Sequence, residues 1–251
     1  MFVKTSLKWS KPEDRTLVLT YDDGPGQIKA DLGVPGPRTL ELAKYLHEMN
    51  IRATFFVIGK HAEEHGKVLA ELARLGHLIG NHTYNHPSGD PHDVSGWTGD
   101  RVDHFAEIQR THEIIKPYVR GKFFFRSPGG SPWPAKKPHL VDTLNQDTNL
   151  RQYVGPVVWN IESQDWTCWR DGDCAKKAVA HIQGQIVTQG GSGIILMHDC
   201  STEQPEREAI LRRNNRALEV AQILLLQLIA AGYQFKRLDE APLPNEESES
   251  R

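Results

Sequence analysis

The segment Leu17-Val18-Leu19-Thr20-Tyr21-Asp22-Asp23-Gly24-Pro25 joins a short apolar run to two adjacent carboxylates and a Gly-Pro turn. Val18, Leu19 and Tyr21 favour a strand, and Gly24-Pro25 ends it. Neighbouring side chains of a strand point to opposite faces, so the two acids need not share a role. Two carboxylates held close together repel each other unless a cation or a proton lies between them. A plain turn is the alternative, because Asp, Gly and Pro are all common turn residues.

The composition limits the classes of protein to consider. A chain of 251 residues with a formal net charge of −2 fits one large α/β domain or two small ones, and it predicts no nucleic-acid partner. The longest apolar stretch, Leu218 to Ala231, contains Glu219, Gln222 and Gln227, which predicts a buried helix and no transmembrane segment. The first residues are not followed by an apolar h-region, so we expect no signal peptide in the sequence as given.

Apolar runs that predict strands alternate with segments of helical spacing along the chain. The expected strands are residues 17–22, 53–58, 77–82, 122–126, 156–161, 193–199 and 233–238, and the expected helices are residues 39–49, 61–75, 97–118, 140–149, 175–188 and 208–231. This alternation predicts an α/β fold with about seven parallel strands, a (β/α) barrel or a distorted one. We expect an N-terminal extension over residues 1–14, one catalytic domain over residues 15–240, and a disordered polar tail over residues 241–251.

Two histidines, His82 and His86, follow the third expected strand. In a helical turn the i, i+4 spacing brings both rings to one side, where they can share an ion. His61 and His65 have the same spacing inside an expected helix, and we expect them on a solvated or half-buried surface instead. His82 and His86 differ from His61 and His65 in that they lie at the end of an expected strand.

Three further strand ends carry polar side chains. Arg126 follows Phe123-Phe124-Phe125 and requires a carboxylate if it is buried, although a surface arginine is the alternative. Asp165-Trp166 comes after the fifth expected strand, where a loop acid beside a packing tryptophan is the alternative. His198-Asp199 ends the sixth, and its imidazole is either a general acid or base or a capped structural histidine.

One acid and two histidines, with a further coordination position left for water or substrate, match the ligand set of a catalytic zinc site. A second carboxylate beside the water can act as base, and a separate imidazole can donate a proton to the leaving group. Five strand ends, each carrying one of these parts, therefore indicate a single hydrolytic site.

These segments resemble the five motifs of the polysaccharide deacetylases, the NodB-homology domain of carbohydrate esterase family 4, over roughly residues 15–240. The matching segments are Thr20–Pro25, His82–His86, Arg126–Gly129, Glu162–Trp166 and Ile195–Asp199. The resemblance implies a distorted (β/α) barrel, with Asp22 as base, Asp23, His82 and His86 as metal ligands, and His198 as general acid. It further implies that Arg126 is oriented toward the base, that Asp165 holds both Arg126 and His198, that Trp166 walls the pocket, and that Leu196 lies under the acetyl methyl group.

The third motif departs from the family pattern, which usually has tyrosine where this chain has Gly129. Glycine keeps the backbone N–H that helps to hold the oxyanion, so catalysis survives the change. The missing ring opens one wall of the cleft, and Trp133 is a candidate to replace it. The loops 26–37 and 167–174 also differ in length and composition, which leaves the substrate open.

The resemblance implies a metal-dependent hydrolase that removes N-acetyl groups from acetamido sugars of the chitin, chitooligosaccharide or peptidoglycan type. The expected cofactor is a divalent metal, zinc first and cobalt or a similar ion second. An O-acetyl xylan esterase, a hydrolase of another amide such as a cyclic ureide, and an inactive sugar-binding homologue remain alternatives. Such substrates imply action outside the cytoplasm. The sequence leaves open the oligomeric state and whether Cys168 and Cys174 form a disulfide.

Overall fold

The computed structural model describes residues 2–8, 15–26, 37–87, 102–130, 138–172, 174–201, 205–241 and 243. Its strands are β1 (Phe2–Leu7), β2 (Thr16–Asp22), β3 (Thr54–Val57), β4 (Leu78–Asn81), β5 (Phe123–Phe124), β6 (Tyr153–Val157), β7 (Ile161–Glu162), β8 (Gly193–His198) and β9 (Gln234–Lys236). Its α-helices are α1 (Thr39–Glu48), α2 (Gly59–Glu64), α3 (Gly66–Arg74), α4 (His104–Ile115), α6 (Pro138–Gln146), α7 (Asp165–Asp171), α8 (Ala175–Thr188), α9 (Pro205–Asn214) and α10 (Ala217–Ala230).

The strands form two parallel sheets, one in the order β4-β3-β2-β8-β7 and the other in the order β1-β6-β5. A parallel bridge between Asn81 and Phe125 joins β4 to the end of β5, so eight strands follow one another in a single curved series. β9 pairs with residues Thr16–Val18 at the start of β2, whereas β3 pairs with residues Thr20–Asp22 at its end. Within the described residues no pairing joins β7 to β1, so this series of parallel strands is open; the α/β class agrees with the expected one, and closure into a barrel is not seen in this part of the chain.

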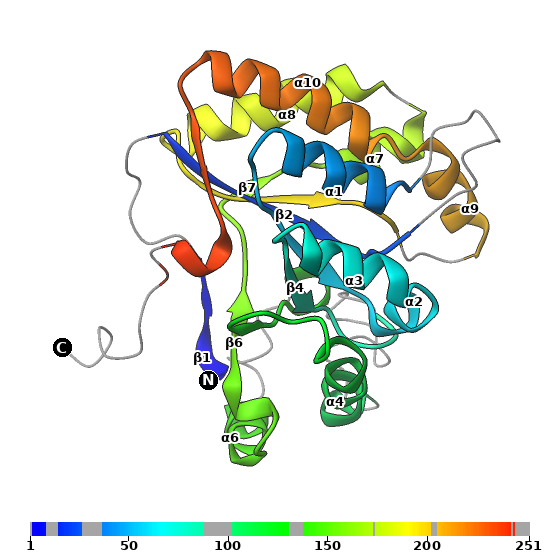
Figure 1. Cartoon of the computed structure of the whole chain (residues 1–251), viewed down its shortest axis with the longest axis vertical. Coiled ribbons are helices and arrows are strands. Elements are labelled where there is room, and N and C mark those ends of the chain that lie inside the picture. Colours follow the sequence, from blue (N-terminus) through cyan, green and yellow to red (C-terminus); the bar gives the residue numbers. More distant parts are fainter. Residues whose placement is uncertain are drawn as a thin grey trace.

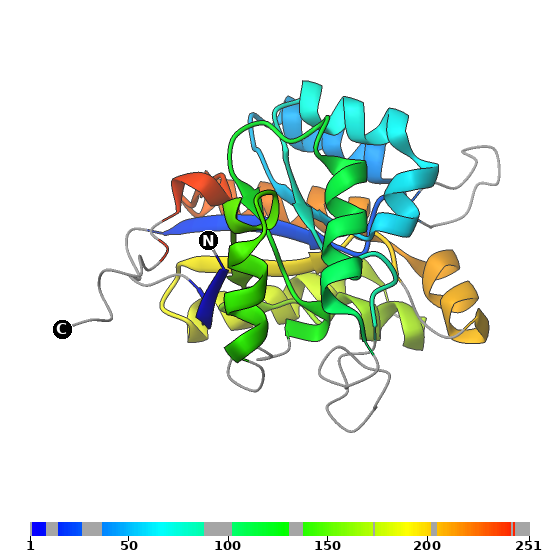
Figure 2. The same ribbon diagram turned by 90° about the horizontal axis from the view of Figure 1, so that it is seen from below.

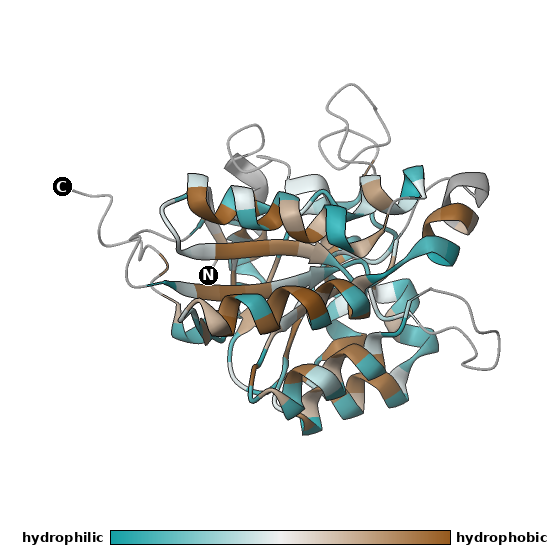
Figure 3. Cartoon of the chain, turned by 90° about the horizontal axis from the view of Figure 1, so that it is seen from above, coloured by the Kyte–Doolittle hydropathy of each residue, from teal (hydrophilic) through white to brown (hydrophobic). Residues whose placement is uncertain are grey.

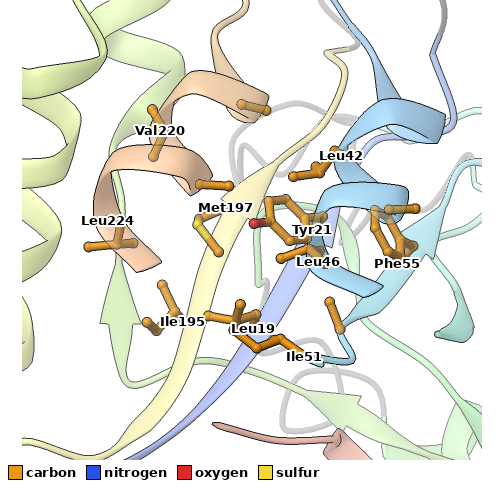
Figure 4. Packing of buried hydrophobic residues seen from close by; sticks show 14 of the residues in the cluster. Leu19, Tyr21, Leu42, Leu46, Ile51, Phe55, Ile195, Met197, Val220 and Leu224 are labelled. Carbon is orange, nitrogen blue, oxygen red and sulfur yellow. The ribbon is translucent and has the colours of Figure 1, made fainter. Parts of the chain in front are cut away.

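The main core lies between the sheet of β2, β3 and β8 and the helices that cover it. Leu19, Tyr21 and Phe55 from the strands pack against Leu46 of α1 and Leu224 of α10, and all are buried (Figure 4). Helices α8 and α10 lie on one side of the molecule and α4 and α6 on the opposite side (Figures 1 and 2). The central strands are hydrophobic over most of their length, whereas the helices mix hydrophobic and hydrophilic residues (Figure 3). No described helix has the length and apolar composition that crossing a membrane requires.

Several elements differ from the expectations. β1 lies in the segment expected to be an extension, and the strand expected over residues 156–161 is divided into β6 and β7. The helix expected over residues 61–75 is interrupted at His65, whose φ of −123° is not helical. The helix expected over residues 208–231 is two helices, separated by Asn215 and Arg216, and the Asn215 side chain accepts a hydrogen bond from the N–H of Ala217, the first residue of α10 (3.0 Å).

Three other expectations concern less regular segments. α7 occupies most of the segment 167–174 that was expected to be a loop. Cys168 and Cys174 form no disulfide in the described chain. Trp133, residues 27–36, most of the expected tail and the start of the helix expected from residue 97 lie outside the described residues.

Candidate active site

The two adjacent acids, Asp22 and Asp23, lie at the carboxyl end of β2. Asp22 is the last residue of the strand, pairs with Phe56 of β3 and His198 of β8, and is buried. Asp23 has a φ of +73°, a left-handed conformation that Asp adopts more readily than most residues. This conformation turns the chain out of the strand directly after Asp22.

The two histidines, His82 and His86, follow β4 at the same edge of the sheet. The turn between them is not helical, because Thr83 and His86 have φ angles of +69° and +53°. It still brings the rings together, with centroids 4.9 Å apart. His82 Nε2 lies 3.6 Å and His86 Nε2 lies 3.5 Å from Asp23 Oδ1.

The donor atoms of Asp23, His82 and His86 all lie within 4.8 Å of one another. The Nδ1 of His82 lies 2.9 Å from Arg126 O, so the proton on Nδ1 leaves Nε2 free to bind a metal. Burial and the neighbouring His86 lower the pKa of His82 to about 3, which keeps the ring neutral. Asp23 Oδ1 is buried and has no hydrogen-bond partner among the described residues. One carboxylate and two imidazoles fit a divalent ion of the zinc type.

Arg126, two residues after the end of β5, is fully buried and pairs with Asp22. Its Nη1 donates to Asp22 Oδ1 at 2.7 Å and to Thr20 Oγ1 at 2.8 Å, while Nε donates to Val157 O at 3.1 Å. The guanidinium also lies 4.2 Å from the ring centre of Phe56. Burial raises the pKa of Asp22, and the Arg126 charge opposes that rise.

His198, the last residue of β8, pairs with Asp165 at the start of α7. Its Nδ1 lies 2.8 Å from Asp165 Oδ1, and its backbone N–H donates to Asp165 Oδ2 at 2.8 Å. Ser163 Oγ also donates to Asp165 Oδ1, which the sequence did not predict. Burial lowers the pKa of His198, but the Asp165 charge more than compensates and raises it to about 10. Within the described residues Asp165 forms no ion pair with Arg126, contrary to the implied role.

One cleft of about 150 Å³ is lined by Asp22, Asp23, His82, His86 and His198, and its walls include Gly129, Trp166 and Leu196. Gly129 has a φ of +59° in the short helical turn Pro128–Gly130. The cleft has four further lining residues that the motifs did not indicate: Trp159, Cys200, Ser201 and Leu211. Trp159 lies next to Gly130, since a Cβ at Gly130 would come within 2.4 Å of its indole ring.

His61 lies closer to the site than its helical position predicted. Its ring is half-buried, and its Nδ1 lies 2.8 Å from the backbone oxygen of Asp23. α2 begins two residues after β3, so its first turn remains at the carboxyl edge of the sheet. His61 thus helps to hold the left-handed conformation of Asp23.

The chain is similar in sequence and in fold to several known proteins. The sequence profile described as polysaccharide deacetylase matches residues 10–148. A chitooligosaccharide deacetylase of Rhizobium leguminosarum bv. trifolii is 26% identical over 233 residues, 91% of this chain and 92% of that protein. A peptidoglycan-N-acetylglucosamine deacetylase of Bacillus cereus is 40% identical over 167 residues, 65% of this chain and 51% of that protein. The crystal structure of the polysaccharide deacetylase Bc1974 from Bacillus cereus has a TM-score of 0.63 and 23% identity, with 93% of each chain covered.

Proposed function

The chain belongs to the polysaccharide deacetylase family, and from that premise we propose that it is a metal-dependent hydrolase that removes N-acetyl groups from acetamido sugars. One observation carries the proposal. Asp22, which pairs with Arg126, and His198, which pairs with Asp165, line the same cleft as Asp23, His82 and His86. A base, an acid and a cation site in one cleft are the parts that amide hydrolysis requires.

Asp23, His82 and His86 would hold the ion, which supplies Lewis acidity toward the acetyl carbonyl and toward water. Asp22 would take a proton from the attacking water. Its burial supports this role, because a carboxylate with a raised pKa is a stronger base. The Arg126 charge opposes the rise in the pKa of Asp22, and its hydrogen bond fixes Oδ1, which leaves Oδ2 directed toward the histidines, 3.6 Å from His82 Nε2.

The oxyanion of the tetrahedral intermediate would accept a hydrogen bond from the Gly129 backbone N–H. His198 would donate the proton that lets the sugar amine leave. Its pKa of about 10 supports this role, since the ring is protonated at neutral pH. Asp165 orients the ring by accepting from Nδ1–H, so that the proton on Nε2 is the one available for transfer. The products are acetate and a free amino sugar.

An acetate-release assay tests the proposal. The chain is stripped with a chelator, reconstituted with Zn²⁺ or Co²⁺, and incubated separately with chitooligosaccharides, peptidoglycan and acetylxylan. We expect metal-dependent release from one or both of the first two. Release from acetylxylan alone would identify an O-acetyl esterase instead, and sugar binding without any release would identify an inactive binding homologue.

A further inference from the structure

The turn that joins the two candidate histidine ligands is held by an acid from a distant helix, Glu107 of α4. The backbone N–H groups of Tyr84 and Asn85 both donate to Glu107 Oε2, at 2.9 and 2.8 Å. The side-chain amide of Asn85 donates to Oε1 at 2.7 Å. One half-buried carboxylate thus receives three hydrogen bonds from two consecutive residues of this turn. Successive N–H groups that point the same way form a concave site for an anion, and here the anion is a side chain.

The opposite side of the turn is held by the start of α2. Gly59 N and Lys60 N donate to the carbonyl oxygens of Thr83 and Tyr84, at 2.8 and 3.0 Å. The turn therefore lies between two helices, with carbonyl groups bound on one side and N–H groups on the other. Thr83 and His86 are in left-handed conformations, which persist in residues other than glycine only where the surroundings impose them. Glu107 binds the N–H groups of Tyr84 and Asn85, and it therefore restrains the backbone between the two histidines.

We propose that Glu107 is a positioning residue for the metal site, which fixes the separation of His82 Nε2 and His86 Nε2 around Asp23 Oδ1. The inference rests on the proposed function only in that these three residues bind a divalent ion. Hydrogen bonds to a charged acceptor are short and strong, so the carboxylate holds the turn in one conformation before the ion binds. Without it the two imidazoles are free to separate, and the affinity for the ion falls.

The substitution Glu107→Gln changes the acceptor at one atom. In one orientation its oxygen still receives the two backbone N–H groups, and the exposed Asn85 amide can turn over to accept from the new –NH2, but the negative charge that strengthens all three bonds is lost. Groups that support metal ligands in this way typically change the affinity by about 10- to 100-fold, so we expect a loss of Zn²⁺ affinity in that range. Adding Asn85→Asp returns a negative charge to the pair, as a carboxylate that accepts from the new –NH2, and should restore most of the affinity.

The matched control is Glu113→Gln on the same helix. Glu113 is exposed and bonds Lys116, so its substitution removes an α4 carboxylate without touching the turn. Zn²⁺ affinity is measured by competition with a chromogenic chelator, and the melting temperature of each metal-free variant is recorded.

The expected order of affinity is wild type, Glu113→Gln and the double variant together, with Glu107→Gln well below them. Unchanged affinity in Glu107→Gln would overturn the inference, whatever its melting temperature. A loss that the added Asn85→Asp does not reverse would overturn it as well. If the wild-type chain binds Zn²⁺ but releases no acetate from any substrate, the proposed function fails while the affinity series still decides the role of Glu107.

Discussion

Replacing Arg126 by leucine should expose the energetic role of the buried pair with Asp22. Both side chains are almost fully buried, and the two charged groups approach to 2.7 Å. At that distance the Coulomb attraction is about 6 kcal/mol for an effective dielectric constant of ~20. Removing each ion from water opposes folding by several kcal/mol, so the intact pair is close to neutral overall. Arg126→Leu keeps the unfavourable burial of Asp22 and removes the attraction, and we expect the free energy of unfolding at pH 7 to fall by about 3 to 5 kcal/mol.

Arg126→Leu should also make the free energy of unfolding depend on pH in a definite direction. Burial already raises the folded-state pKa of Asp22, and losing the Arg126 charge raises it further, while the unfolded-state pKa stays near the ordinary value of about 3.9. Between these two values the folded chain binds more protons than the unfolded chain, so stability rises as the pH falls through that window. The difference in the free energy of unfolding between the variant and the wild type should therefore become smaller as the pH falls.

Urea unfolding of the metal-free chains at pH 7 and at pH 5 measures both effects. The control is Asp22→Asn combined with Arg126→Leu, which leaves no buried charge at this position. The double variant should be at least about 2 kcal/mol more stable than Arg126→Leu alone at pH 7. If the single and double variants lose the same free energy of unfolding, and the loss does not depend on pH, then an uncompensated Asp22 charge is not the cause of the destabilisation.

Three further predictions concern catalysis. Asp22→Asn should keep the metal but lower kcat for acetate release by about 10²- to 10⁴-fold, and near wild-type turnover would remove Asp22 as the base. His82→Ala should lose the metal, measured as bound Zn²⁺ per chain, and unchanged metal content would remove His82 from the ligand set. Asp165→Asn removes the negative charge that raises the pKa of His198, so the alkaline limb of the kcat profile should move to lower pH by about 1 to 3 units. Asp171→Asn, an exposed position on the same helix, should leave that limb in place.

The strands that form the centre of the sheet could be predicted because their sequences are predominantly apolar. Segments 17–22, 53–58 and 193–197 are buried on both faces, and before the strand ends only Thr20 and Thr54 interrupt their apolar residues. β1 could not be predicted, because Phe2-Val3-Lys4-Thr5-Ser6-Leu7 is no such run and its pairing with β6 is fixed by tertiary structure. The break between α9 and α10 was missed for a similar reason. Asn215 lies at this break and accepts a hydrogen bond from Ala217 N, a side-chain contact that spacing does not reveal.

The candidate site residues could be found because the carboxyl ends of parallel strands meet at one edge of the sheet. Asp22, Arg126 and His198 each end a strand or follow one closely, and the fold brings them together there. Glu107 has no such signal, because it is a helical residue whose partners are backbone N–H groups. His61 was expected away from the site for its helical position, although its helix starts at that same edge.

The roles of the two adjacent acids depend on the backbone conformation of the second one. In a continuing strand Asp23 would point to the face opposite Asp22, away from the histidines that Asp22 approaches. With a φ of +73° it breaks that alternation, and both Asp22 Oδ2 and Asp23 Oδ1 lie 3.6 Å from His82 Nε2. Asp tolerates this conformation better than a bulky or β-branched residue, and it also supplies the ligand oxygen. The second position of Asp-Asp-Gly therefore requires both a left-handed backbone and a carboxylate, which explains why two acids stand side by side where the strand ends.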